Sequence, residues 1–265
     1  MKRFLLLIVS LLSLGVSRAE RVDLQTSKAA SVLVCGGSMM NGDQFADSVQ
    51  AVMKTHYAGC KKIALVLHAT LPEDRDRMEE RLRKAFQHLG GFAVESLHRH
   101  DRSGQRALLE KADGIFVGGG ETFVLLSDLY RSGQIDILRR RVLAGIPFGG
   151  TSAGANVAGL LIGTTNDFPV TFVPTRRALA VFPAVINPHH PLPANKADFD
   201  GRVGKIKAYL RFNPDETVFA LSNAAIARLN GGRVTLEAGA GWVYHGAGVR
   251  ELKLGEEVPE LMPKS

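Results

Sequence analysis

Short apolar runs alternate with amphipathic segments over the first 150 residues of the chain. Apolar residues dominate the runs 32–35, 62–67, 93–97 and 114–117, which have the length of buried strands. Between and after them, apolar positions recur at helical spacing and predict helices near 43–56, 72–89, 105–111, 122–130 and 135–144. Such alternation is typical of βαβ units. We therefore expect an α/β fold, with a mostly parallel sheet, helices on both faces and a site at the carboxyl ends of the strands.

The alternation is not divided by a repeat, a low-complexity run or a long linker. At 265 residues, of which 45% are hydrophobic, the chain is long enough to bury a large core. We predict one α/β domain from about residue 25 to 258, followed by a polar tail at 259–265.

The first nineteen residues have a different pattern. A basic start, Met1-Lys2-Arg3, precedes the apolar run 4–16 and the small-x-small site Ser17-Arg18-Ala19. The apolar run is shorter than the roughly 20 residues that a membrane span needs. We predict a signal peptide at 1–19 and export to a periplasm or the medium, without stable membrane association. An uncleaved anchor is the alternative.

Charge argues against a nucleic-acid partner. Removal of residues 1–19 lowers the formal net charge from +7 to +4. The remaining basic residues are interleaved with acids, as in 75–84, which is typical of a solvated helix face.

The two cysteines, Cys35 and Cys60, come after one predicted strand and before the next. In parallel strands they would lie at opposite ends, about 15 Å apart, and a disulfide requires Cα atoms within about 7 Å. We predict two free thiols.

The segment 149–155, GGTSAGA, joins an apolar run to a predicted helix and contains Gly150-x-Ser152-x-Gly154. At such a junction this pattern indicates a nucleophile elbow, in which the serine adopts a strained backbone and glycines leave room for the turn. The alternative is a glycine-rich turn whose serine caps the next helix.

A second glycine-rich turn, 118–120, follows the strand 114–117 and opens a helix. Uncovered amides at a helix amino terminus favour an anion. They could bind a phosphate, or form an oxyanion hole in which Gly120 acts together with the amide of Ala153. A plain tight turn is the third possibility. A Walker-type phosphate site is disfavoured because no Lys-Ser or Lys-Thr pair follows.

A serine nucleophile needs a base and an acid that orients it. The candidates downstream are His189, beyond the apolar run 181–186, and Asp167. Only 37 positions separate Ser152 from His189, which is shorter than in an ordinary esterase. The histidines lack metal-ligand spacing such as His-Glu-x-x-His, so we expect neither a metal nor a cofactor.

Five segments together carry a resemblance to a known family: 118–123 (GGGETF), 152–156 (SAGAN), 164–167 (TTND), 186–189 (INPH) and 213–218 (NPDETV). In this order and spacing they resemble the dipeptidase E, or aspartyl dipeptidase, family of serine peptidases, whose fold is similar to class I glutamine amidotransferases. The resemblance implies Ser152 as nucleophile, His189 as general base and Asp167 as its partner. It also implies an oxyanion hole at Gly120 and Ala153, and a dipeptide with an amino-terminal Asp as substrate.

Two departures concern the substrate. Glu121 stands where the family usually has Asn, and a carboxylate there could hold a substrate's α-ammonium. Arg202 and Lys205 stand near the family's arginines, where they could hold a side-chain carboxylate, or simply begin an exposed helix at 203–212.

Other functions remain open. A secreted cyanophycinase-like β-aspartyl peptidase shares the fold, and so could a non-catalytic binding module. A glutamine amidotransferase would need cysteine in place of Ser152. The sequence gives no oligomeric state.

Overall fold

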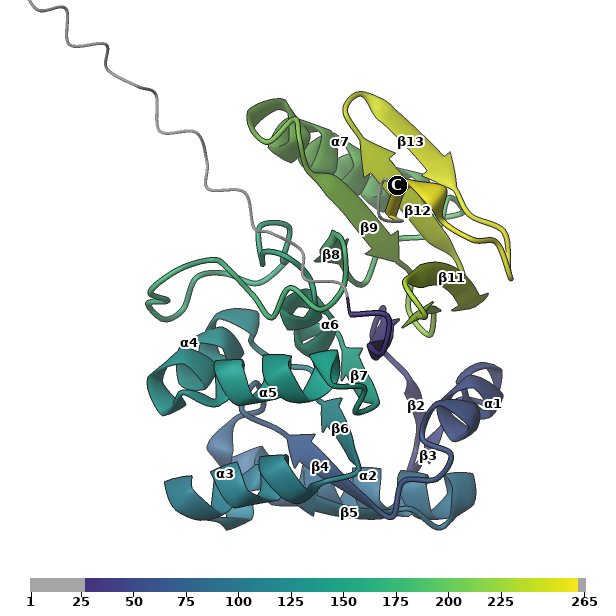
Figure 1. Ribbon diagram of the computed structural model, residues 1–265. Helices are drawn as coiled ribbons and strands as arrows, with labels where there is room; N and C mark the ends of the chain where they lie inside the picture. The colour runs from purple at the N-terminus through teal and green to yellow at the C-terminus, as the bar shows by residue number, and fades with distance from the viewer. Residues whose placement is uncertain (1–26, 262–265) are drawn as a thin grey trace, which may run out of the picture.

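A computed structural model describes residues 27–261 and confirms the α/β expectation. Its central sheet has seven strands in the order β11-β10-β1-β7-β6-β4-β5, of which β11, β7, β6, β4 and β5 are labelled in Figure 1. The five strands from β1 to β5 in this order are parallel, whereas β10 and β11 run antiparallel at one edge. Their bounds are β1 (Ser31–Cys35), β4 (Lys62–Val66), β5 (Ala93–Ser96), β6 (Gly114–Val117), β7 (Phe148–Thr151), β10 (Ile226–Asn230) and β11 (Arg233–Ala238).

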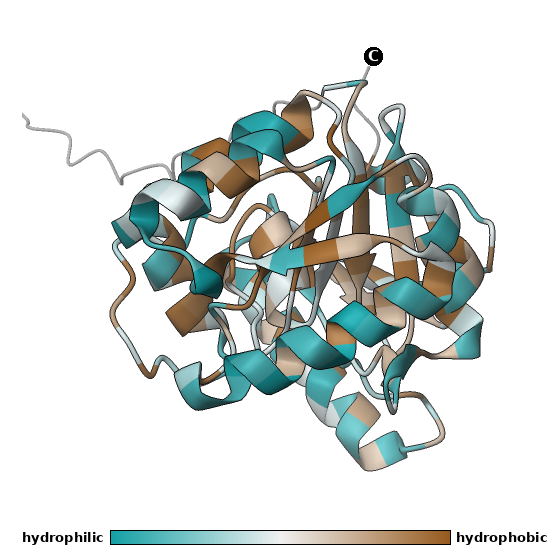
Figure 2. Cartoon of the chain, turned by 90° about the horizontal axis from the view of Figure 1, so that it is seen from below, coloured by the Kyte–Doolittle hydropathy of each residue, from teal (hydrophilic) through white to brown (hydrophobic). Residues whose placement is uncertain are grey.

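Helices cover both faces of this sheet. One set comprises α1 (Asp47–His56) and α2 (Arg75–Gly90), and the other α3 (Arg102–Lys111), α4 (Thr122–Ser132), α5 (Gln134–Leu143) and α6 (Ala153–Ala158). Side chains of β1 alternate between the two cores: Leu33 packs with the first set, and Val32 with the second. Figure 2 shows the brown strands between helices whose outer surfaces are largely teal.

A smaller sheet, which the sequence did not resolve, lies beside the first. It has the order β13-β12-β9-β8, with bounds β8 (Val185–Asn187), β9 (Thr217–Leu221), β12 (Gly241–His245) and β13 (Gly248–Glu251). Helix α7 (Lys196–Phe212) packs on it through Ile206 and Leu210, against Trp242 and Tyr244. The strands β8 and β9 are parallel, so both end at the same edge.

Minor elements complete the described chain. They are the hairpin of β2 (Met40–Asn41) and β3 (Gln44–Phe45) and the 3-10 turns η1 (Pro72–Asp74), η2 (Leu97–Arg99) and η3 (Pro259–Leu261). The turn η3 falls within the expected polar tail, yet its Leu261 is buried.

Several element predictions were wrong in their bounds: the helices expected at 43–56 and 105–111 begin at Asp47 and Arg102. The apolar run 181–186 becomes a strand only from Val185, because the amides of Leu179 and Val181 bind carbonyls of α6 instead. The helix expected at 203–212 begins at Lys196, which places Arg202 in its middle.

The predicted signal peptide lies outside the described residues. Within 27–261 no helix is both long and apolar enough to span a membrane. Cys35 and Cys60 are free, as predicted, since β7, β6 and part of the core separate β1 from β4.

Candidate active site

Ser152 lies in a sharp turn between β7 and α6. Its φ of 54° and ψ of −114° lie in a region that residues with a side chain rarely adopt. A Cβ on Gly150 would overlap the carbonyl oxygen of Gly154, and one on Gly154 would overlap that of Val117. The backbone therefore has the geometry of a nucleophile elbow.

His189 follows β8 and faces the serine. Its Nε2 is 2.8 Å from Ser152 Oγ, although the two residues are 37 positions apart. His189 also has a positive φ, 53°, and its amide donates to the carbonyl of Gly36 at 2.7 Å. The expected pairing of nucleophile and base is present in the geometry.

The other ring nitrogen of His189 contacts a residue that the sequence did not single out. Nδ1 is 2.7 Å from Asn223 Oδ1. An amide oxygen only accepts, so Nδ1 carries the hydrogen and Nε2 is left to accept from the Ser152 hydroxyl. Asn223 thus occupies the orienting position that we expected for Asp167.

Asp167 is elsewhere, and its expected role as the partner of His189 is not what the structure has. Its carboxylate accepts from the amide of Thr122 at 2.8 Å, at the first turn of α4. Thr122 Oγ1 in turn accepts from Thr165 at 3.1 Å, and Asn156 donates to Thr122 Oγ1 at 3.3 Å. A carboxylate is favoured at a helix amino terminus, so Asp167 stabilises the start of α4 and leaves the amide of Gly120 uncovered.

The hydrophobic pattern of the sequence contained a feature that could have indicated Asn223. The apolar strand β9 ends in Leu221 and is followed by the polar pair Ser222-Asn223. Because β8 and β9 are parallel neighbours, residues just beyond each strand meet at one sheet edge. Recognising 217–221 as a strand beside the histidine strand would have placed Asn223 near His189.

The turn 118–120 lies against the nucleophile. A Cβ on Gly119 would come within 3.0 Å of Ser152 Cβ, and Gly120 adopts a φ of 129°. The next amide, that of Glu121, donates to Ala69 at 2.9 Å and fixes the turn. Within residues 27–261, the amides of Gly120 and Ala153 have no backbone or side-chain acceptor, which an oxyanion hole requires.

The three candidate substrate-binding side chains fall into two places. Glu121 is half-buried at the amino end of α4. Arg202 and Lys205 line a cavity of about 290 Å³ together with polar groups of Asn166 and Asn187. The structure brings the two cations together, but Glu121 does not line their cavity.

Arg202 is held directly behind the histidine. Its Nη1 donates to Asn187 Oδ1 at 2.9 Å and to the carbonyls of Pro188 at 3.3 Å and His189 at 3.4 Å. All three acceptors are uncharged. Burial lowers the pKa of this guanidinium, and the nearby Tyr244 and Asp198 only partly offset that effect.

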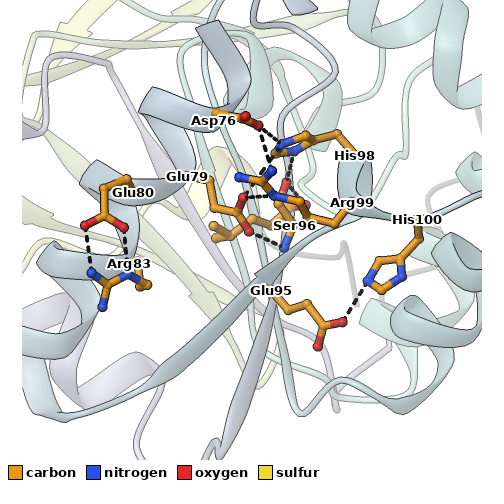
Figure 3. A network of polar contacts seen from close by, with 10 residues as sticks. Asp76, Glu79, Glu80, Arg83, Glu95, Ser96, His98, Arg99 and His100 are labelled. Atoms are coloured by element: carbon orange, nitrogen blue, oxygen red, sulfur yellow. Dashed lines mark hydrogen bonds and ion pairs between the residues drawn. The ribbon is translucent and has the colours of Figure 1, made fainter.

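A separate polar cluster lies between α2 and η2 (Figure 3). Asp76, Glu79 and His98 place ligand atoms within 4.8 Å of one another. Arg99 already pairs with both carboxylates, at 3.0 Å to Asp76 and 2.6 Å to Glu79. Glu79 also accepts from the amide of Ser96, so the cluster ties α2 to the end of β5.

Comparison with known proteins gives consistent matches. Residues 32–237 match Peptidase family S51. The chain is 39% identical to Peptidase E of Haemophilus influenzae, over 65% of this chain and 78% of that protein. It is 31% identical to Peptidase E of Streptomyces coelicolor, over 88% of this chain and 95% of that protein. A Drosophila melanogaster protein named "Probable alpha-aspartyl dipeptidase" is 38% identical to it, over 62% of this chain and 68% of that protein.

A solved structure of a peptidase from an acI-B1 Actinobacterium has the same fold. It superposes with a TM-score of 0.64 at 13% identity and covers 86% of this chain and 96% of that one. Ser152, His189 and Asn223 all lie within the matched range 32–237.

Proposed function

Because the chain belongs to Peptidase family S51, we propose that it is a serine exopeptidase that cleaves dipeptides with an amino-terminal Asp. The observation that supports this most strongly is the hydrogen-bonded series Ser152, His189 and Asn223, built on a nucleophile elbow. Relatives named Peptidase E and alpha-aspartyl dipeptidase support the choice of substrate class.

In the proposed reaction, Ser152 Oγ attacks the carbonyl carbon of the scissile peptide bond while His189 Nε2 takes the hydroxyl proton. The carbonyl oxygen becomes an oxyanion, which the amides of Gly120 and Ala153 stabilise. His189 then returns the proton to the leaving amine, the C–N bond breaks, and an acyl-enzyme remains. Water attacks the ester by the same route and restores the free serine.

Asn223 has a defined part in this cycle. Its amide oxygen keeps the hydrogen of the neutral imidazole on Nδ1 and stays bonded to it when the ring becomes positively charged. A neutral acceptor stabilises that charge less than a carboxylate would. The enzyme therefore depends more on orientation and on the oxyanion hole than on charge stabilisation by the third residue.

Substrate recognition in this proposal uses the two places described above. Glu121 directly follows an oxyanion donor and pairs with the substrate's α-ammonium. Arg202, which lacks an acidic partner among its hydrogen bonds, and Lys205 attract the aspartyl carboxylate. Binding both ends of one residue selects the first peptide bond.

The proposal is tested by hydrolysis of Asp-Leu, isoAsp-Leu and an Asp-Arg polymer, with Ser152→Ala as the control for contaminating peptidases. Release of free Asp from Asp-Leu alone supports it. Preference for isoAsp-Leu or the polymer would instead indicate a β-aspartyl peptidase, and no Ser152-dependent hydrolysis of any substrate would indicate a binding module.

Export completes the proposal. The basic start, the apolar run and the small-x-small site of residues 1–19 support secretion or a periplasmic location.

A further inference from the structure

The turn at the end of β1 binds each of the three segments that carry the site. The carbonyl of Cys35 accepts from the amide of Ser152 at 3.1 Å, and that of Gly36 accepts from His189 at 2.7 Å. The carbonyl of Gly37 accepts from Ala224, next to Asn223, at 2.8 Å. Three consecutive carbonyls therefore meet three segments that are far apart in the sequence.

The amides that this turn binds belong to strained residues. Ser152, His189 and Ala224 have φ values of 54°, 53° and 56°. Within residues 27–261 only two other non-glycine residues, Ser38 and Ala180, have a positive φ, and Ser38 directly follows this turn. A strained conformation persists only where its surroundings fix it. Each of the three strained residues donates its amide to a carbonyl of the turn, so the turn holds these strained conformations in place.

The turn also limits where the imidazole can lie. Gly37 has a φ of 108°, and a Cβ there would lie 2.5 Å from Nε2 and 2.7 Å from Nδ1 of His189. The backbone of Gly37 therefore lies directly against the imidazole ring of His189 and limits where the ring can move. A Cβ on Gly36 would likewise lie 2.8 Å from the carbonyl oxygen of Leu221, ahead of Asn223.

We propose that the turn Cys35-Gly36-Gly37 is a positioning device that sets the register between nucleophile, base and orienting amide. Its residues act through their backbone, by binding the segments that carry the three side chains. The inference rests on the proposed serine-peptidase function, because it assigns the turn a role in that same site.

The main test is Gly37→Ala, whose Cβ would overlap the His189 ring and displace it from its hydrogen bonds to Ser152 and Asn223. A misplacement of about 1 Å can lower the rate of a catalytic step by about 100-fold. We expect a loss of that size in kcat for Asp-Leu, with KM little changed, and an equal loss in the rate at which a fluorophosphonate labels Ser152.

Gly42→Ala is the matched control. Gly42 also has a positive φ, 60°, and lies in the neighbouring β2–β3 turn, but a Cβ there meets nothing within 4 Å. Alanine there carries a left-handed backbone penalty without touching the ring. Both rates should stay close to wild type, and the loss of thermal stability should be smaller than that of Gly37→Ala.

Amide hydrogen exchange on the wild type keeps the inference testable if Gly37→Ala does not fold. The amides of Ser152, His189 and Ala224 should be protected and should exchange as one group. Rapid exchange of any one of them would overturn the proposal. So would a Gly37→Ala variant labelled as fast as Gly42→Ala. A wild type that is not labelled at all would refute the proposed function instead.

Discussion

The role of Asn223 yields the sharpest prediction about the site. Asn223→Ala removes the acceptor 2.7 Å from His189 Nδ1 and leaves the ring free to rotate or to change tautomer. A hydrogen bond to a group that becomes charged contributes about 1.5–3 kcal/mol. Because Asn223 is exposed to solvent, we expect the lower half of this range, which corresponds to a loss of about 10- to 50-fold in kcat/KM for Asp-Leu.

Asn223→Asp makes the opposite change. A carboxylate keeps the same hydrogen bond and adds attraction to the imidazolium that forms in the transition state. His189 in this variant is protonated more easily. As the pH falls, it therefore stops acting as a base at a higher pH than in wild type. We therefore expect activity near or above wild type at pH 8, and an acid limb of the pH–kcat/KM profile that moves to higher pH.

Asp167 provides the comparison. Asp167→Asn retains an oxygen that accepts from Thr122, so we expect only a small loss of kcat/KM. Steady-state kinetics on the three variants decides between the two residues. The reasoning is refuted if Asp167→Asn loses several orders of magnitude while Asn223→Ala stays near wild type.

The remaining predictions concern substrate, stability and processing. N-acetylation of Asp-Leu removes the charge that Glu121 pairs with and should cost about 1.5–3 kcal/mol in wild type but little in Glu121→Gln; equal rates on both peptides in wild type would exclude an exopeptidase. Burial lowers the pKa of His190 to about 4, so the unfolded chain binds a proton more readily, and this residue alone should lower stability by up to about 3 kcal/mol between pH 6.5 and pH 4. The buried His56 and His68, whose pKa values are also lowered, add to the fall. Urea unfolding of His190→Phe should show a weaker pH dependence over that window. Intact mass of the exported protein should correspond to a chain that begins at Glu20, and retention of Met1 in a membrane fraction would contradict the signal peptide.

The sequence predicts the parallel strands of the central sheet, because β1, β4 and β6 are apolar runs that are buried on both faces. It does not predict the antiparallel edge strands β10 and β11, in which buried and less buried residues alternate or end in polar positions. The strands 114–117 and 32–35 agree with β6 and β1 to within one residue. The smaller sheet is harder to predict, because β8 has only three residues and the apolar residues before it pack on α6 instead of pairing in a sheet. The local pattern of apolar residues indicates which segments are buried. It does not show whether the backbone of a buried segment binds a strand or a helix.

The candidate site divides in the same way. Ser152 is predictable because the elbow is a local motif, and His189 because it follows an apolar run in a recognisable segment. The choice between Asp167 and Asn223 depends on how β8 and β9 are paired and on the path of the chain after α6. An acidic residue in the expected order is therefore insufficient evidence for a partner of the histidine.

The central claim is that His189 activates Ser152 as a nucleophile. Its most direct measurement is covalent labelling with a fluorophosphonate, followed by peptide mapping by mass spectrometry. We expect one adduct per chain, on Ser152. It should form rapidly in wild type, at a rate lower by several orders of magnitude in His189→Ala, and not at all in Ser152→Ala. Labelling at another residue, or labelling of Ser152 at the same rate without His189, would contradict it.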